Sequence, residues 1–151
     1  AALAQERACS EGPRPGSLLE VLSAGLVGEG NSILVRDLES DLTQRAGAPL
    51  EVANAWSYRA VRQNQVAVEL RVQNTSALPW TTEGAELVST EGVRLRVVRV
   101  WQAGPVVPGE HERLVVEAEA PAGAQSQGTF LLKLHEAGGV RTVTVRGVTF
   151  P

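Results

Sequence analysis

Residues 65–73 read QVAVELRVQ, and this stretch decides the fold. Its apolar and polar residues alternate, which is the period of a β-strand whose successive side chains point to opposite faces. A strand with one buried and one solvated face is typical of antiparallel sheets. The inward set is Val66, Val68, Leu70 and Val72, and the outward set is Ala67, Glu69, Arg71 and Gln73. We therefore expect Val68→Asp to unfold the domain and Glu69→Lys to change its stability little.

The same two-residue period recurs from residue 50 onward. Turn-forming residues separate the periodic stretches, which predicts about seven short strands. They lie at roughly 50–60, 65–73, 85–89, 93–101, 112–120, 128–136 and 140–150. A mainly β chain of this kind is typical of an immunoglobulin-like antiparallel sandwich. Cys9 is the chain's single cysteine, so the cysteine pair of antibody domains is absent.

Three irregularities interrupt this period. The consecutive apolar residues Val97-Val98 predict a β-bulge or a change of sheet. Gly138-Gly139 predicts a hairpin turn between the last two strands. Gly147 is expected to reset the alternation, so that the apolar residues after it point inward.

The first 49 residues have a different pattern, which predicts one or two short helices. Residues 1–8 are strong helix formers, so residues 1–15 are expected to be the end of an upstream linker helix. Ser17 and Glu20 form a capping box before a helix at about 18–26. Asn31 or Ser32 is expected to cap a second helix whose apolar face carries Leu34, Leu38 and Leu42. We therefore expect residues 16–49 to be a helical segment packed on a sandwich formed by residues 50–151.

Composition excludes several classes of partner. The net charge is −3 and 21% of the residues are charged, which argues against a nucleic-acid partner. No apolar run approaches the roughly 18 residues of a membrane-spanning helix. The chain contains no methionine, so we expect it to have been cut from a longer precursor.

Several short runs of the sequence form a distinctive set. They are Tyr58-Arg59, Val66-Ala67-Val68-Glu69, Pro79-Trp80, Val97-Val98-Arg99-Val100-Trp101, Pro108-Gly109-Glu110, Val115-Val116-Glu117-Ala118 and Gly128-Thr129-Phe130, with residues 132–144 and 148–151 as the most specific parts. Over about residues 16–151 this set resembles a myxobacterial paralogous family of uncharacterised secreted proteins. His135 stands where this family usually has Trp. The resemblance implies a signal peptide, an upstream β-rich domain, a helical linker and an extracytoplasmic location, and it implies no activity.

The sequence predicts no catalytic residue, no cofactor and no metal site. Nucleophile, phosphate-loop and dinucleotide motifs are absent from the sequence. His111 and His135 would meet only if their strands paired, and we expect them to be surface residues. Glu117 and Glu119 share one strand face, as paired glycosidase carboxylates do. Cross-strand ion pairs with Arg94, Arg96 and Arg99 are the simpler interpretation.

The tryptophans are the remaining candidates for a binding site. Trp56 and Trp101 fall within predicted strands and are expected in the core. Trp80 follows Pro79 in a loop, where it either covers the end of the sandwich or is exposed. An exposed Trp80 would form a ligand-binding site together with Asn74 and Thr81.

Two hypotheses about function follow from these patterns. The first is a non-enzymatic interaction or structural module of the cell envelope, which binds a protein in cis (its own upstream domain) or in trans. The alternative is a carbohydrate-binding module that uses the exposed Trp, with a polysaccharide as partner. Neither hypothesis involves nucleic acid or a membrane span within this segment.

Overall fold

The strand at the centre of the fold is β4 (Gln65–Asn74), and it has the predicted alternation. A computed structural model describes residues 33–120 and 128–151 of the chain. Val66, Val68, Leu70 and Val72 are completely buried, whereas Arg71 is exposed. β4 pairs antiparallel with β3 (Leu50–Ala60) on one side and with β8 (His111–Glu119) on the other. The inward face of this strand is therefore confirmed.

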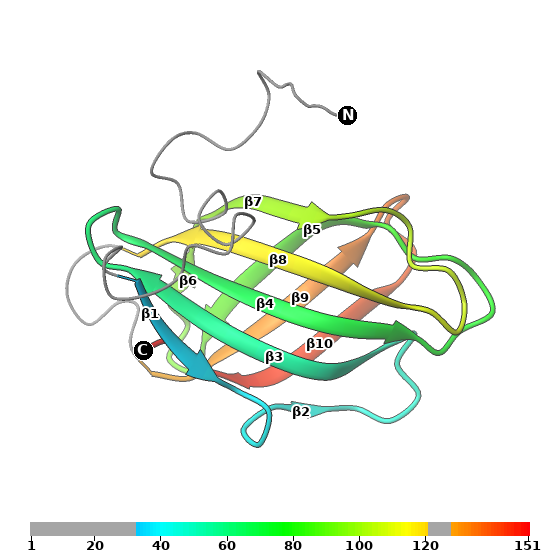
Figure 1. The fold of residues 1–151 in the computed structure, drawn as a ribbon, viewed down its shortest axis with the longest axis horizontal. Coiled ribbons are helices and arrows are strands. Elements are labelled where there is room, and N and C mark those ends of the chain that lie inside the picture. Colours follow the sequence, from blue (N-terminus) through cyan, green and yellow to red (C-terminus); the bar gives the residue numbers. More distant parts are fainter. Residues whose placement is uncertain (1–32, 121–127) are drawn as a thin grey trace.

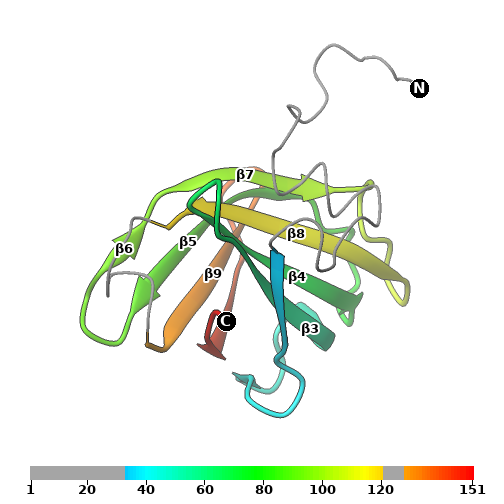
Figure 2. The same cartoon turned by 60° about the vertical axis from the view of Figure 1, so that its left-hand side comes forward.

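The described residues form two antiparallel sheets of five strands that lie face to face (Figures 1 and 2). The first sheet has the order β1-β3-β4-β8-β7, in which β1 is Ile33–Asp37 and β7 is Val97–Gln102. The second has the order β2-β10-β9-β5-β6. Its strands are β2 (Thr43–Gln44), β10 (Thr142–Val148), β9 (Phe130–Glu136), β5 (Thr82–Ser89) and β6 (Arg94–Leu95).

The main core lies between the two sheets. Its apolar side chains come from alternate positions of the strands on both sides, as sandwich packing requires. Phe130 and Phe150 meet edge to face in this core, with 5.5 Å between their ring centroids. The mainly β prediction is thus confirmed, with more strands than expected because residues 33–44 contribute two and the stretch at 93–101 divides into two.

Two of the connections between consecutive strands join an edge strand of one sheet to an edge strand of the other. β6 pairs with β5 in the second sheet, and β7 pairs with β8 in the first. The register of β7 shifts between Val97 and Arg99, which confirms the irregularity expected at Val97-Val98. On the opposite side of the sandwich, β1 of the first sheet continues into β2 of the second, through a turn in which Leu38 is buried. Each side of the sandwich is therefore crossed by one continuous stretch of chain.

The two glycine features near the end of the chain are also confirmed. Gly138 and Gly139 have φ of 92° and 73° in the turn between β9 and β10, which are values that favour glycine. Gly147 has φ of 91°, and the register between β10 and β9 shifts around it. A Cβ at this position would lie 2.2 Å from the carbonyl oxygen of Asp41. Both the bulge and this close approach require glycine.

The helix predicted after Asn31 and Ser32 is wrong, because residues 33–37 form strand β1 and pair with β3. Ile33, Leu34 and Val35 are good strand formers, and pairing with β3 outweighs the spacing-of-four leucine pattern. The three leucines of that pattern do not share one face: Leu34 is 48% exposed, whereas Leu38 is buried in the main core and Leu42 packs against that core. The helix predicted at 18–26 and the linker helix in residues 1–15 lie outside the described residues.

Candidate functional site

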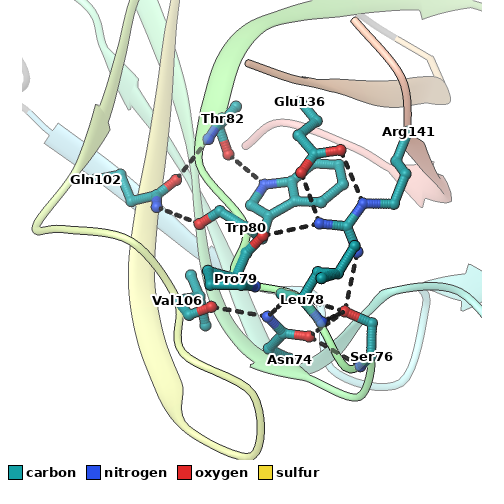
Figure 3. Close-up of polar contacts among 10 residues, drawn as sticks. All are labelled: Asn74, Ser76, Leu78, Pro79, Trp80, Thr82, Gln102, Val106, Glu136 and Arg141. Atoms are coloured by element: carbon teal, nitrogen blue, oxygen red, sulfur yellow. Dashed lines mark hydrogen bonds and ion pairs between the residues drawn. The ribbon is translucent and has the colours of Figure 1, made fainter. Parts of the chain in front are cut away.

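Trp80, the residue proposed as an exposed binding platform, is completely buried. Its main chain forms an isolated bridge with Val106: the Trp80 amide donates to the Val106 carbonyl at 3.0 Å, and the Val106 amide donates back at 2.8 Å. The indole Nε1 donates to Thr82 Oγ1 at 2.8 Å (Figure 3). Of the two alternatives for Trp80, the structure shows the buried one, and Trp80 closes one end of the sandwich.

Arg141 is the residue that covers Trp80, and sequence reasoning missed it. Its Cζ lies 5.3 Å from the centroid of the indole, in cation–π contact. Its Nε and Nη2 donate to the two carboxylate oxygens of Glu136 at 2.8 and 2.6 Å. Nη1 donates to Ser76 Oγ at 2.9 Å and Nη2 to the Pro79 carbonyl at 2.8 Å (Figure 3). The guanidinium thus ties the β9–β10 hairpin to the loop that carries Trp80.

Glu136 is held as a carboxylate by this arrangement. The hydrogen bonds from Arg141 lower the pKa of Glu136 below its ordinary value, and Glu136 in turn raises the pKa of Arg141. The forked, bidentate pair also fixes the plane of the guanidinium over the indole. The charge pair therefore has a structural task in this cluster.

Asn74, the second candidate residue, is buried and has its hydrogen-bonding capacity filled. Its Nδ2 donates to the carbonyls of Leu78 and Val106 at 2.8 and 2.7 Å. Its Oδ1 accepts from the amide and the hydroxyl of Ser76 at 2.8 and 2.7 Å. An amide side chain has two donors and one oxygen, so none is left for a ligand.

The third candidate, Thr81, is exposed, and its carbonyl accepts a hydrogen bond from Ala137. Gln102, which sequence reasoning did not identify, completes the support: its Oε1 accepts from the Thr82 amide at 3.0 Å, and its Nε2 donates to the carbonyls of Trp80 and Gly104 at 3.1 and 2.6 Å. Asn74 and Trp80 thus belong to a buried structural cluster, and Thr81 is an exposed neighbour of it. A carbohydrate site built on the Trp80 indole therefore loses its basis.

A different surface carries the partly exposed aromatic residues. It is the face of the first sheet that points away from the second, and we call it the aromatic face. Ala67 shows its orientation, because it lies between Val66 and Val68, whose side chains belong to the core between the sheets. Trp56 and Trp101 are only partly buried here, so their expected place in the core is wrong. The aromatic face consists of Ile33, Trp56, Tyr58, Ala60, Ala67, Trp101 and Val115.

A polar network crosses the aromatic face. Arg113 Nε donates to Glu69 Oε2 at 2.5 Å, and Tyr58 Oη donates to Glu69 Oε1 at 2.6 Å. The Arg113 guanidinium lies over Trp101, with 5.5 Å between Cζ and the ring centroid. Burial and the neighbouring Glu69 carboxylate raise the pKa of Tyr58 well above its ordinary value. The network fixes the positions of Tyr58 in β3 and Trp101 in β7. These two strands flank the adjacent strands β4 and β8.

The expected ion pairs are confirmed in part. Glu119 pairs with Arg96 at 3.0 Å, whereas Arg94 pairs with Glu86 of β5 at 2.7 Å. Arg94 cannot face Glu117 or Glu119 because β6 belongs to the second sheet. The side chain of Glu117 is buried, and its residue lies across from Arg99 in the β7–β8 register.

The histidines lie in different sheets, His111 in β8 and His135 in β9, so their strands do not pair. His135 Nε2 lies 2.7 Å from Glu86 Oε2. In residues 33–120 and 128–151, no group of three metal-ligating side chains comes together. The same residues contain no helix long and apolar enough to cross a membrane.

Comparison with known proteins gives one match. No curated protein and no solved structure matches the chain. A family model described as a protein of unknown function (DUF2381) matches residues 21–148, which is most of the chain. The chain therefore belongs to the DUF2381 family.

Proposed function

We propose that this chain is a non-enzymatic interaction module that binds a protein through the aromatic face. The observation that supports this proposal is the outward position of Trp56 and Trp101, which are only partly buried beside the buried Tyr58 and Val115. Tryptophan, tyrosine and arginine are the residues that most often dominate protein interfaces. Here they lie together on one sheet face.

The geometry of this face suits binding with little loss of conformational freedom. Tyr58 and Arg113 both hydrogen-bond Glu69, and Arg113 stacks over Trp101, so these side chains are already ordered. A surface that is ordered before binding loses less entropy when a partner arrives. An ordered face with large side chains therefore supports protein recognition in cis, by the chain's own upstream part, or in trans.

The setting of this module belongs to the same proposal. The family resemblance supports an extracytoplasmic location, in the periplasm, the outer envelope or the secreted fraction, and a place in a myxobacterial set of paralogues. The paired five-stranded sheets support an immunoglobulin-like classification of the sandwich. Fold alone does not determine function, so the test has to address the surface itself.

The experiment is affinity capture from native envelope extract with the tagged full chain and two variants. Trp56→Ser with Trp101→Ser removes the two large rings of the aromatic face. Leu131→Ser is the matched control, since Leu131 is a partly exposed apolar residue of β9. A protein captured by the wild type and the control, but lost with the double variant, is the expected result. Equal capture by all three forms, or turnover of an envelope polymer by the isolated chain, would contradict the proposal.

A further inference from the structure

A groove of about 510 Å³ runs between β10 and the chain that leads from β2 to β3. Figure 1 shows this connection beside the edge of the second sheet. The volume falls in the range of ordinary ligand sites. The residues that line it are Thr43, Gln44, Arg45, Ala46, Gly47, Ala48, Thr142, Val143, Thr144 and Arg146.

The floor of the groove is an unpaired strand edge. β2 pairs only with Val145 and Arg146 of β10, so residues 142–144 have no neighbouring strand on that side among the residues that the structure describes. The Glu136 amide donates to the Arg141 carbonyl, and in an antiparallel ladder hydrogen-bonded and non-hydrogen-bonded pairs alternate. Thr142 and Thr144 are in the non-hydrogen-bonded pairs with β9. Their main-chain amides and carbonyls therefore point away from β9 and toward the groove.

The opposite wall is fixed in place by contacts to other elements. Gln44 Nε2 donates to the Leu50 carbonyl at 2.5 Å, and its Oε1 accepts from the Val52 amide at 3.1 Å. The Thr75 hydroxyl donates to the Ala48 carbonyl at 2.8 Å, and the Thr75 amide donates to the Pro49 carbonyl at 3.0 Å. These bonds hold residues 45–48 apart from β10, so the groove is formed before any ligand arrives.

The charge of the groove is positive. None of the described residues that line it is acidic, and its two arginines, Arg45 and Arg146, are exposed. Neither arginine has an ion-pair partner among the residues that the structure describes. Lys133 lies next to Thr144 in the β9–β10 register. Carboxylate side chains of a ligand would thus find cations and no competing acid along the groove.

We propose that an extended, acidic segment of a partner protein binds in this groove as an added strand beside β10. The segment exchanges main-chain hydrogen bonds with Thr142 and Thr144, and its carboxylates pair with Arg45 and Arg146. This mode of recognition uses the unpaired edge for affinity and the side chains at the rim for specificity. The groove is formed by other residues than the aromatic face, so this site goes beyond the proposed function and stands or falls separately from it.

The test uses labelled, capped octapeptides of alternating pattern and the full chain. SEVTVEVT is the acidic probe, SQVTVQVT its neutral counterpart and SKVTVKVT its basic counterpart. A fourth probe is the acidic peptide with alternate backbone nitrogens methylated, which removes donors and leaves the side chains unchanged. Fluorescence anisotropy measures affinity, and hydrogen exchange of Thr142 and Thr144 reports the position of binding.

We expect the acidic peptide to bind most tightly and the methylated form to bind about tenfold or more weakly, since it loses two or more hydrogen bonds. Thr142→Pro removes one outward amide and should weaken binding about threefold to tenfold. Arg45→Gln with Arg146→Gln should abolish the preference for acidic over neutral peptide. Arg62→Gln, in the exposed β3–β4 turn, is the matched control and should bind as the wild type does.

Three results would overturn the proposal, and all of them are obtained with the wild-type chain. They are absence of binding by every probe at about millimolar concentration, equal affinity for the methylated and unmethylated peptides, and exchange protection confined to the aromatic face. The double tryptophan variant should bind the acidic peptide normally. Failure of the peptide test therefore leaves the aromatic-face proposal intact. Failure of the capture experiment likewise leaves the groove proposal intact.

Discussion

Arg141 lies directly over the indole of Trp80, with 5.3 Å between its Cζ and the ring centroid, although Trp80 lies between β4 and β5 and Arg141 lies in the turn before β10. Because the guanidinium also bonds Glu136, Ser76 and Pro79, it covers the ring from a position that is itself fixed. One side chain from the β9–β10 turn therefore contributes to the burial of Trp80.

Removal of that side chain should expose Trp80. In a background with Trp56→Phe and Trp101→Phe, Trp80 is the only tryptophan, so its fluorescence reports its environment. Arg141→Ala should shift its emission to longer wavelength and increase quenching by acrylamide. Arg146→Ala, at an exposed position of β10, should leave both unchanged. Unchanged quenching in Arg141→Ala would show that other groups bury the ring.

Trp80→Ala should destabilise the domain by about 3–5 kcal/mol, because it leaves a large cavity where a completely buried ring was. Urea unfolding followed by circular dichroism measures this loss. Thr81→Ala, at the exposed neighbouring position, should change the free energy of unfolding by less than about 0.5 kcal/mol. Equal effects of the two substitutions would contradict the buried position of Trp80.

Tyr58 should titrate abnormally, and it is the chain's only tyrosine. Burial, followed by its hydrogen bond to Glu69, raises its pKa above the ordinary value of about 10. The neutral phenol is thus favoured in the folded state, so its stabilisation is complete below about pH 10 and is lost as pH rises toward the folded pKa. Absorbance at 295 nm should show phenolate only well above pH 10, or on unfolding. Glu69→Gln should bring the transition to lower pH, and an ordinary titration in the wild type would refute the contact.

The pair Val68→Asp and Glu69→Lys has a different expected outcome from the one that the sequence suggests. Val68→Asp places a charge in the core and should unfold the domain, at a cost above about 4 kcal/mol. Glu69→Lys is not neutral, because it removes the acceptor of Tyr58 and puts a cation beside Arg113. Arg71→Gln is the better control, since Arg71 is exposed and lies across from Arg113. Urea denaturation should rank stability as wild type and Arg71→Gln, then Glu69→Lys, then Val68→Asp.

Acid should weaken the fold through Glu86 and Glu136. Hydrogen bonds from Arg94 and then His135 lower the pKa of Glu86, and those from Arg141 lower the pKa of Glu136. Their stabilisation is present above the unfolded pKa, about 4.3, and is lost as pH falls through the lower folded values. Urea midpoints should therefore fall between about pH 5 and pH 3, less steeply in Glu136→Gln. Glu51→Gln is the control, because Glu51 has no ion pair among the described residues.

Much of the sandwich could be predicted from local pattern. The alternation in β4, the glycine pair before β10 and the shift at Gly147 depend on residues close together in sequence, and each is confirmed. β1 could not be recognised in this way, because its leucine spacing also fits a helix and its pairing partner, β3, begins only after β2. Pairing with β3 across the sheet makes this segment a strand rather than a helix.

The candidate site was harder to predict, for the same reason. Trp80 in isolation looks like a loop tryptophan, and only the fold shows that Arg141 covers it. The positions of Trp56 and Trp101 within strands indicated burial, but not which side of the sheet they face. Their places depend on the register of β3 and β7 against their neighbours, which no short stretch of sequence contains.

Two of the connections between the sheets, from β1 to β2 and from β6 to β7, have a mechanical consequence. Each of these connections joins an edge strand of one sheet to an edge strand of the other. The two sheets are therefore linked covalently along both edges of the sandwich. The sheets therefore cannot slide apart as two separate layers unless β1 or β2 is detached on one side and β6 or β7 on the other. A pulling force applied across the layers meets strand hydrogen bonds as well as apolar packing.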